Sequence, residues 1–201
     1  MGLNRGLVAR VTSAAVVRPK YGHRVGGDAA FVVATEHRVL AVVIDVLGHG
    51  KDAHDLAVQL QHYLVANASG DVVDMLSQLH YAYRGSRGAA VGLCVIDPEI
   101  ARLRFAGVGN TVIRRFGDSE TRLVSRDGIV GGTMRTPVEE TLDLSTGDVV
   151  MMYTDGVRSH FDPSACARLR TDTPHAMAAG VIHRFGKPHD DASCVVLRYE
   201  R

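Results

Sequence analysis

Short apolar runs, most of them rich in valine and alanine, recur along the whole chain and predict β-strands. Each run is bounded by Gly, Asp, Asn or Pro, the residues that favour turns. Several of the connections are too short for a crossover helix, so we expect mostly antiparallel sheets. The predicted strands are residues 7–17, 29–35, 39–46, 89–96, 102–106, 111–116, 121–124, 141–144, 149–153 and 192–199.

Three other stretches place apolar residues three or four positions apart, which predicts amphipathic helices. The first covers residues 53–68, and the second covers residues 72–83 behind Asp71, a suitable N-cap. The third has Thr173 as N-cap and Pro174 at the first helical position, and it stops at Gly186. Strands therefore outnumber helices, and we expect an α+β fold in which two mostly antiparallel sheets pack together between outer helices, a four-layer α-β-β-α sandwich.

The size and charge of the chain limit its organisation and its partners. With 201 residues and no linker or repeat, we expect a single domain over residues 1–201. The formal net charge of +1 provides no field that would attract nucleic acid. No signal-peptide pattern and no apolar run of about 20 residues is present, so we expect a cytoplasmic protein without a membrane span. The 3 cysteines have no CxxC spacing, which argues against a disulfide framework or a zinc site.

Aspartates at the ends of predicted strands are the candidate chemistry. Asp28 begins one strand, Asp45 ends the next, Asp155 follows a third, and the pair Asp190-Asp191 precedes the last. Buried carboxylates are costly unless they are paired or bind a metal, and strand ends that meet at one sheet edge would bring several together. Oxygen ligands alone favour Mg²⁺ or Mn²⁺ over zinc. Many of the 21 glycines flank these positions, and we interpret them as clearance for metals and a phosphate.

Each aspartate taken alone has an ordinary structural explanation. Asp155-Gly156 is a common hairpin turn signal. Asp190-Asp191 also fits a solvated strand start, and Gly26-Gly27-Asp28 fits a plain loop. The functional interpretation therefore depends on the whole ordered series.

That series resembles the PPM metal-dependent serine/threonine phosphatases, in their bacterial SpoIIE/RsbX branch. The resemblance covers residues 20–199, and the order of the motifs is more specific than any single one. The motifs are Gly26-Gly27-Asp28, Asp45-Val46-Leu47-Gly48-His49-Gly50, Gly107-Val108-Gly109-Asn110, Gly128-Ile129-Val130-Gly131-Gly132, Gly147-Asp148, Thr154-Asp155-Gly156 and Asp190-Asp191-Ala192-Ser193.

The resemblance implies a β-sandwich with a binuclear Mn²⁺ or Mg²⁺ centre at one edge. It implies that Asp45 bridges the metals and that the backbone carbonyl of Val46 is a ligand. It further implies that Asp155 and Asp190 bind the other metal, and that Asp28 is a ligand or holds metal-bound water. The implied reaction is direct hydrolysis, in which a metal-activated water attacks phosphorus without a phosphoenzyme.

His49 is a candidate general acid, because a leaving serine or threonine alkoxide needs a proton and imidazole titrates near neutral pH. Its alternative role is to order the loop between Gly48 and Gly50 at the start of a helix. We expect the other histidines, His54 among them, to be surface or packing residues.

The resemblance also implies the substrates, which in this branch are phosphorylated STAS-domain proteins of stressosome and partner-switching modules. We expect a monomer that acts on them as a phosphoserine/phosphothreonine phosphatase. Arg18, before the first glycine motif, is either a contact to phosphate or an ordinary solvated residue. Two alternatives remain: a non-catalytic pseudophosphatase that binds a partner, and a phosphatase for small phosphoesters.

Overall fold

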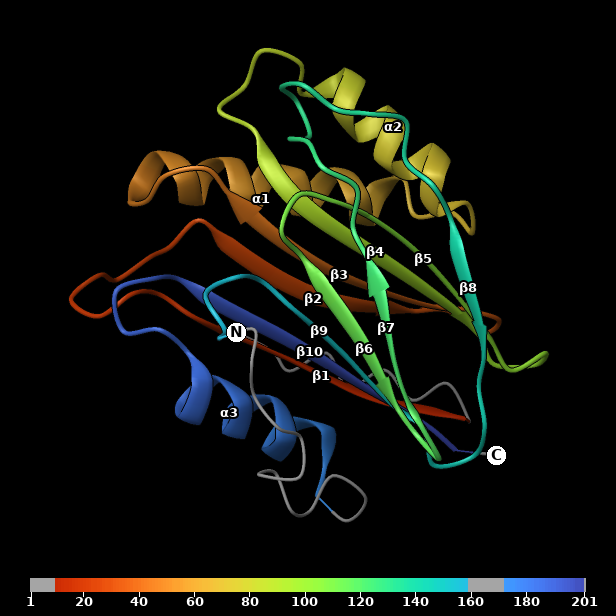
Figure 1. The fold of residues 1–201 in the computed structure, drawn as a ribbon. Coiled ribbons are helices and arrows are strands. Elements are labelled where there is room, and N and C mark those ends of the chain that lie inside the picture. Colours follow the sequence, from red (N-terminus) through yellow and green to blue (C-terminus); the bar gives the residue numbers. More distant parts are fainter. Residues whose placement is uncertain (1–9, 159–171, 201) are drawn as a thin grey trace.

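Ten strands and three helices make up the part of the chain that the computed structural model describes, residues 10–158 and 172–200 (Figure 1). The predicted strands and helices are all present, most within two residues of their expected bounds. Residues 7–9 of the first predicted strand, and Cys166, lie outside the described residues.

The strands form two five-stranded sheets in which every strand pair is antiparallel. In order across the first sheet they are β1 (Val11–Arg18), β10 (Ala192–Tyr199), β9 (Val149–Tyr153), β6 (Val112–Phe116) and β7 (Glu120–Val124). Across the second they are β2 (Asp28–Ala34), β3 (Val39–Val46), β4 (Ala89–Asp97), β5 (Arg102–Val108) and β8 (Glu140–Asp143). The antiparallel sheets predicted from the short connections are thus confirmed.

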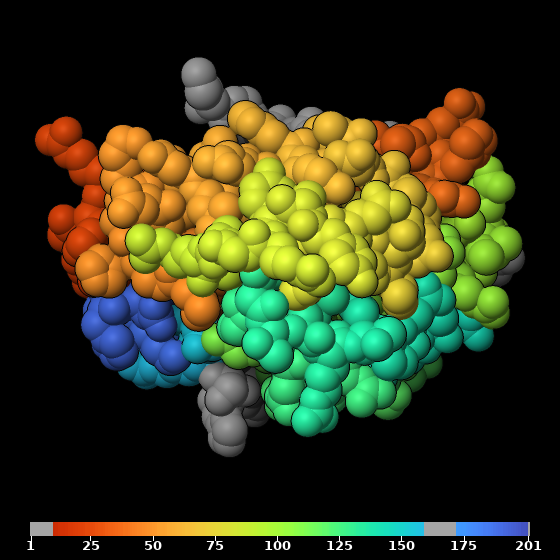
Figure 2. All heavy atoms as spheres, turned by 90° about the horizontal axis from the view of Figure 1, so that it is seen from above, coloured from red at the N-terminus to blue at the C-terminus, as the bar shows by residue number. Residues whose placement is uncertain are grey.

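The sheets pack face to face, and helices cover their outer faces. Helices α1 (Lys51–Ala66) and α2 (Val72–Ala82) pack on the second sheet, while α3 (Pro174–Phe185) packs on the first. A separate apolar cluster, which includes Phe105 and Met152, fills the space between the sheets. Viewed from above, α1 and α2 occupy most of that face, and the segment between β7 and β8 borders α2 (Figure 2). The expected four-layer α-β-β-α sandwich is confirmed.

Local capping explains where the helices begin. The Asp71 carboxylate accepts hydrogen bonds from the backbone N–H groups of Val73 and Asp74, and the Thr173 hydroxyl accepts one from Ala176. Both N-caps were predicted. Helix α1 begins two residues earlier than predicted, directly after Gly50, whose φ of 80° a residue with a side chain would rarely adopt. Among the described helices, none is long and apolar enough to cross a membrane.

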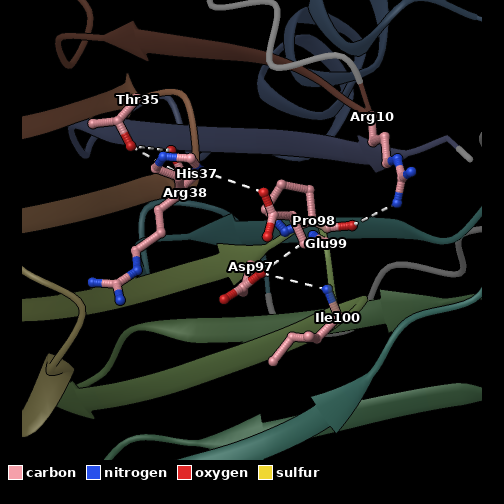
Figure 3. A network of polar contacts seen from close by, with 8 residues as sticks. All are labelled: Arg10, Thr35, His37, Arg38, Asp97, Pro98, Glu99 and Ile100. Carbon is pink, nitrogen blue, oxygen red and sulfur yellow. Dashed lines mark hydrogen bonds and ion pairs between the residues drawn. The ribbon is translucent and has the colours of Figure 1, made fainter.

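Polar contacts close one end of the sandwich, where the β2–β3 and β4–β5 turns lie (Figure 3). The Asp97 carboxylate accepts hydrogen bonds from the N–H groups of Glu99 and Ile100, at 3.2 and 3.4 Å. The two turns are joined by a contact of 3.3 Å between Nδ1 of His37 and Oε1 of Glu99. The guanidinium of Arg10 donates a hydrogen bond to the backbone carbonyl of Pro98. The candidate aspartates lie at the opposite end of these strands.

Candidate metal centre

The strand pairing brings the four candidate aspartates to one edge of the sandwich. Asp28 and Asp45 lie directly opposite each other at the β2–β3 pair of the second sheet. Asp155 follows β9 and Asp190 precedes β10, and these neighbouring strands of the first sheet are antiparallel. The end of β9 and the start of β10 therefore meet at the same edge, so each sheet contributes two carboxylates.

Asp45 is the electrostatic centre of this group. Its burial and the negative charges of Asp155 and Asp190 raise its pKa from 3.8 to about 7. A hydrogen bond from the Asn110 side chain opposes this rise. The charges of both carboxylates of the other sheet therefore act on Asp45.

Asp28 is more deeply placed and is held by a hydroxyl network. Its side chain is buried and accepts a hydrogen bond of 2.6 Å from the Thr154 hydroxyl, the residue before Asp155. Thr154 in turn accepts a hydrogen bond from the backbone N–H of Ser193 in β10. Burial, followed by the charge of Asp45, raises the pKa of Asp28 well above its usual value. Asp28 thus links the two sheets below the group of carboxylates.

The two neighbouring aspartates before β10 have different surroundings. The Asp191 carboxylate is buried and accepts hydrogen bonds of 2.8 Å from the backbone N–H groups of Lys20 and Gly27. Asp190 is half-buried, and its own burial, followed by the charge of Asp155, raises its pKa. Asp191 therefore anchors the loop before β2, while Asp190 belongs to the group around Asp45.

Arg18 holds the loop that carries Asp190. Its guanidinium donates hydrogen bonds to the backbone carbonyls of Lys187, at 2.7 Å, and Asp190, at 3.3 Å. It also lies over the ring of Tyr21, 5.0 Å from the centroid. Both hydrogen bonds come from Nη2, and Nε of Arg18 is buried, so Arg18 is not an ordinary solvated residue but holds this loop.

Gly26 and Gly27 allow close packing of this loop. A Cβ at position 26 would overlap the Asp191 carboxylate, and one at position 27 would lie 2.9 Å from the carbonyl oxygen of Val46. At these two positions the absent side chain therefore makes room for protein atoms. The expected clearance for a metal or phosphate is not what the structure shows there.

His49 makes no contact with the candidate ligands among the interactions of the described residues. It is exposed in the loop before α1, and its ring packs edge-on against His23 with centroids 5.8 Å apart. No hydrogen bond between His49 and any of the four carboxylates occurs within the described residues. His54, expected to be a surface or packing residue, has its Nδ1 3.3 Å from the carbonyl oxygen of Gly26.

Two residues of the site were missing from the candidates. Asn110 donates to Asp45, and Thr154 donates to Asp28. Both stood within quoted motifs, Gly107-Val108-Gly109-Asn110 and Thr154-Asp155-Gly156. The motifs therefore contained the signal, but only the packing of one sheet on the other shows what these side chains contact.

The donor chemistry of this edge suits a hard divalent cation. Asp45, Asp155 and Asp190 supply only carboxylate oxygens, the ligands that Mg²⁺ and Mn²⁺ prefer. Within residues 10–158 and 172–200, no three His, Cys, Asp or Glu side chains are arranged so that they could hold a metal ion together. A cation would nonetheless offset both causes that raise the pKa of Asp45, the burial of its charge and the repulsion from Asp155 and Asp190. The residues therefore fit Mn²⁺ or Mg²⁺ by their chemistry.

Without divalent cations, the protein is expected to lose stability as the pH rises from 5 to 8. Folding raises the pKa of Asp45 from 3.8 to about 7, so the folded state binds this proton more tightly. The associated stability is fully present below pH 4 and is lost progressively as the pH rises to 7, by about 4 kcal/mol in total and about 3 kcal/mol between pH 5 and 8. Burial also raises the pKa of Asp28, so Asp28 changes the stability in the same direction.

Urea unfolding in EDTA at pH 5 and at pH 8 measures the effect. Asp45→Asn should remove most of it, and equal or greater stability at pH 8 in the unmodified protein would contradict the prediction.

The fold is similar to that of solved bacterial phosphatase structures. A structure of RsbX in complex with magnesium superposes with a TM-score of 0.85 at 18% identity, covering 99% of this chain and 100% of that one. A structure described under the bacterial stressosome, a modular system adapted to control secondary messenger signalling, gives a TM-score of 0.87 at 22% identity, covering 94% and 100%. The sandwich is thus that of the PPM-type phosphatases, as the resemblance implied.

The sequence itself identifies the family. The model of the family described as Stage II sporulation protein E (SpoIIE) matches residues 35–200. The chain therefore belongs to the SpoIIE family. It is also 24% identical over 148 residues to the phosphoserine phosphatase RsbX of Bacillus subtilis (strain 168), covering 70% of this chain and 74% of that protein. The predicted branch is confirmed.

Proposed function

We propose that the protein is a Mn²⁺- or Mg²⁺-dependent phosphoserine/phosphothreonine protein phosphatase. The observation that carries the proposal is the group of Asp45, Asp155 and Asp190, contributed by two different sheets, in which burial and then the charges of Asp155 and Asp190 raise the pKa of Asp45 to about 7. Membership of the SpoIIE family and the relationship to a phosphoserine phosphatase support this function.

In this proposal each residue at the edge has a separate role. Asp45 would hold both metal ions, one of them together with the carbonyl of Val46, and Asp155 and Asp190 would hold the other metal. Asp28, because it is buried and bonded to Thr154, holds metal-bound water or orients the ligands from below. The metals, when bound, supply an activated water and neutralise charge on the phosphoryl oxygens.

The chain's own groups then control orientation and proton transfer. The Asn110 amide fixes the Asp45 carboxylate, and Arg18 fixes the backbone that carries Asp190. We keep His49 as the candidate proton donor to the leaving alkoxide. Its place in the exposed loop before α1 would let it approach the oxygen of a bound phosphoprotein from solvent.

The proposed substrates are phosphorylated STAS-domain proteins of a stressosome-type partner-switching module. The relationship to RsbX and the likeness to a structure described under the bacterial stressosome support this choice. We further propose that residues 1–201 act as a single catalytic domain, as a monomer, in the cytoplasm.

Phosphate release from a phosphorylated STAS-domain protein tests the function. We expect release with Mn²⁺ and none with EDTA, because the carboxylates alone activate no water. Release in EDTA would contradict the metal mechanism. Preference for small phosphoesters over every phosphoprotein would favour the second enzymatic alternative, and binding without release would favour the pseudophosphatase.

A further inference from the structure

A cavity of about 380 Å³ opens beside Asp155 on the outer face of the first sheet. Val124, Val112 and Tyr153 lie side by side on β7, β6 and β9 and form a row across its lining. Asp155 is the one residue that this cavity shares with the candidate ligands. A chain whose phosphorylated residue reaches the metal centre can therefore continue into this cavity.

Charged side chains line the cavity at both ends, and at the end near the metal centre they include Lys187, whose Nζ lies 3.9 Å from Asp190. Asp127 and Asp155 line it where β7 and β9 have ended, close to the candidate metal centre. Arg122 lines it two residues before Val124 on β7, on the same face and further from the centre. The end remote from the carboxylates is thus positive.

Arg122 differs from the arginine beside it. Arg114, directly opposite on β6, is buried and forms an ion pair of 2.6 Å with Glu120. Arg122 is exposed, and it has no hydrogen bond or ion pair with any other described residue. Arg122 lines the cavity together with Tyr153. Burial raises the pKa of Tyr153, and the charge and hydrogen bond of Arg114, followed by the charge of Arg122, oppose that rise. Arg122 therefore has donors available to a ligand.

We propose that this cavity is a docking subsite for the substrate polypeptide, in which Arg122 binds an acidic side chain near the phosphorylated residue. The inference rests on the proposed phosphatase function and extends it to substrate choice. A guanidinium binds a carboxylate through charge-assisted hydrogen bonds, and the apolar row beside it accommodates the aliphatic part of the peptide.

The strand geometry sets the position of the acidic residue. Arg122 and Asp155 are separated by four residues along the strands and by two strand spacings, which together amount to roughly 16 Å. An extended peptide advances about 3.3 Å per residue. The acidic side chain is therefore expected roughly three to five residues from the phosphorylated one.

Phosphopeptides with one Glu moved along the flanks, against an all-Ala series, test the subsite. We expect Glu at the matching position to lower KM roughly three- to tenfold with little change in kcat, as a partly exposed charge pair would. Arg122→Ala should abolish this preference and leave the KM of the all-Ala peptide unchanged. Arg122→Glu should transfer the preference to a Lys-flanked peptide. Arg102→Ala is the matched control and should leave the preference unchanged. Arg102 is an exposed arginine at the start of β5 in the second sheet, at the end of the sandwich opposite the metal centre.

Two results would overturn the inference: a KM that does not depend on flanking charge, or an equal loss on every peptide in Arg122→Ala. An equal loss on every peptide would mean that Arg122 contacts the phosphate or supports the fold. The unfolding midpoint of Arg122→Ala distinguishes these two explanations, because only loss of the fold would lower it. Binding of non-hydrolysable phosphonate peptides with Mn²⁺, followed by fluorescence anisotropy, makes the outcome independent of turnover. If peptide affinity depended on the flanking Glu but no peptide were hydrolysed, the phosphatase function would be contradicted and the docking subsite would still be supported.

Discussion

Asp45→Asn is expected to reduce phosphate release by about 10³-fold or more while the protein remains folded. The substitution keeps the shape of the side chain and removes the charge that faces Asp155 and Asp190. Loss of a bridging ligand removes several kcal/mol of charge stabilisation in the transition state, and each 1.36 kcal/mol corresponds to about tenfold in rate. Single-turnover release of phosphate at saturating Mn²⁺ measures the effect.

A matched substitution separates loss of the site from loss of the fold. Asp118→Asn makes the same chemical change in the exposed turn between β6 and β7, and it should leave the rate unchanged. In EDTA, Asp45→Asn should be at least as stable as the unmodified protein above pH 7, because it removes a repelled buried charge. Activity within tenfold of the unmodified protein would show that Asp45 does not bridge the metals.

The helices and strands could be predicted from the sequence because apolar runs and N-cap residues are strong local signals. The apolar run of β3 is buried along nearly its whole length between α1 and the first sheet, which is why it shows no alternation. The caps Asp71 and Thr173 act through neighbouring N–H groups and depend on nothing distant in the chain. Such features are encoded within a few residues.

Contacts between distant segments could not be predicted in the same way. The pairing of β1 with β10 and of β9 with β6 determines which strand ends meet, and an apolar run contains no record of its partner. Aspartates at strand ends were expected to converge, and they do. That Thr154 would donate to Asp28 follows only from how one sheet packs on the other.

The glycine motifs show the same limit. They were expected to give space to metals and phosphate, but Gly26 and Gly27 instead admit the Asp191 carboxylate and the Val46 carbonyl. The motif indicated that a close approach occurs, and the structure supplied the identity of the approaching atoms. For this site, glycine allows the loops that carry the aspartates to pack against one another.

Gly156→Ala is expected to destabilise the protein by about 3 kcal/mol and to weaken Mn²⁺ binding. Gly156 is buried directly after Asp155, and its carbonyl accepts a hydrogen bond of 2.7 Å from the N–H of Lys187. A Cβ there would overlap the backbone carbonyl of Asp191, and backbone at the start of β10 cannot move aside as a flexible side chain does. The loops carrying Asp155 and Asp190 would have to separate. Urea unfolding and calorimetric titration with Mn²⁺ measure the two effects.

Gly180→Ala provides the matched control for this prediction. Gly180 lies within α3, and a Cβ there would meet nothing within 4 Å. The same added methyl group should therefore stabilise the protein by about 0.5–1 kcal/mol through helix propensity and leave Mn²⁺ affinity unchanged. If Gly156→Ala behaved like Gly180→Ala, the two loops would not be held in contact by the absence of a side chain at position 156. The spacing of Asp155 and Asp190 would then need another cause, such as the hydrogen bond from the Lys187 N–H to the Gly156 carbonyl or those from Arg18 to the Lys187 and Asp190 carbonyls.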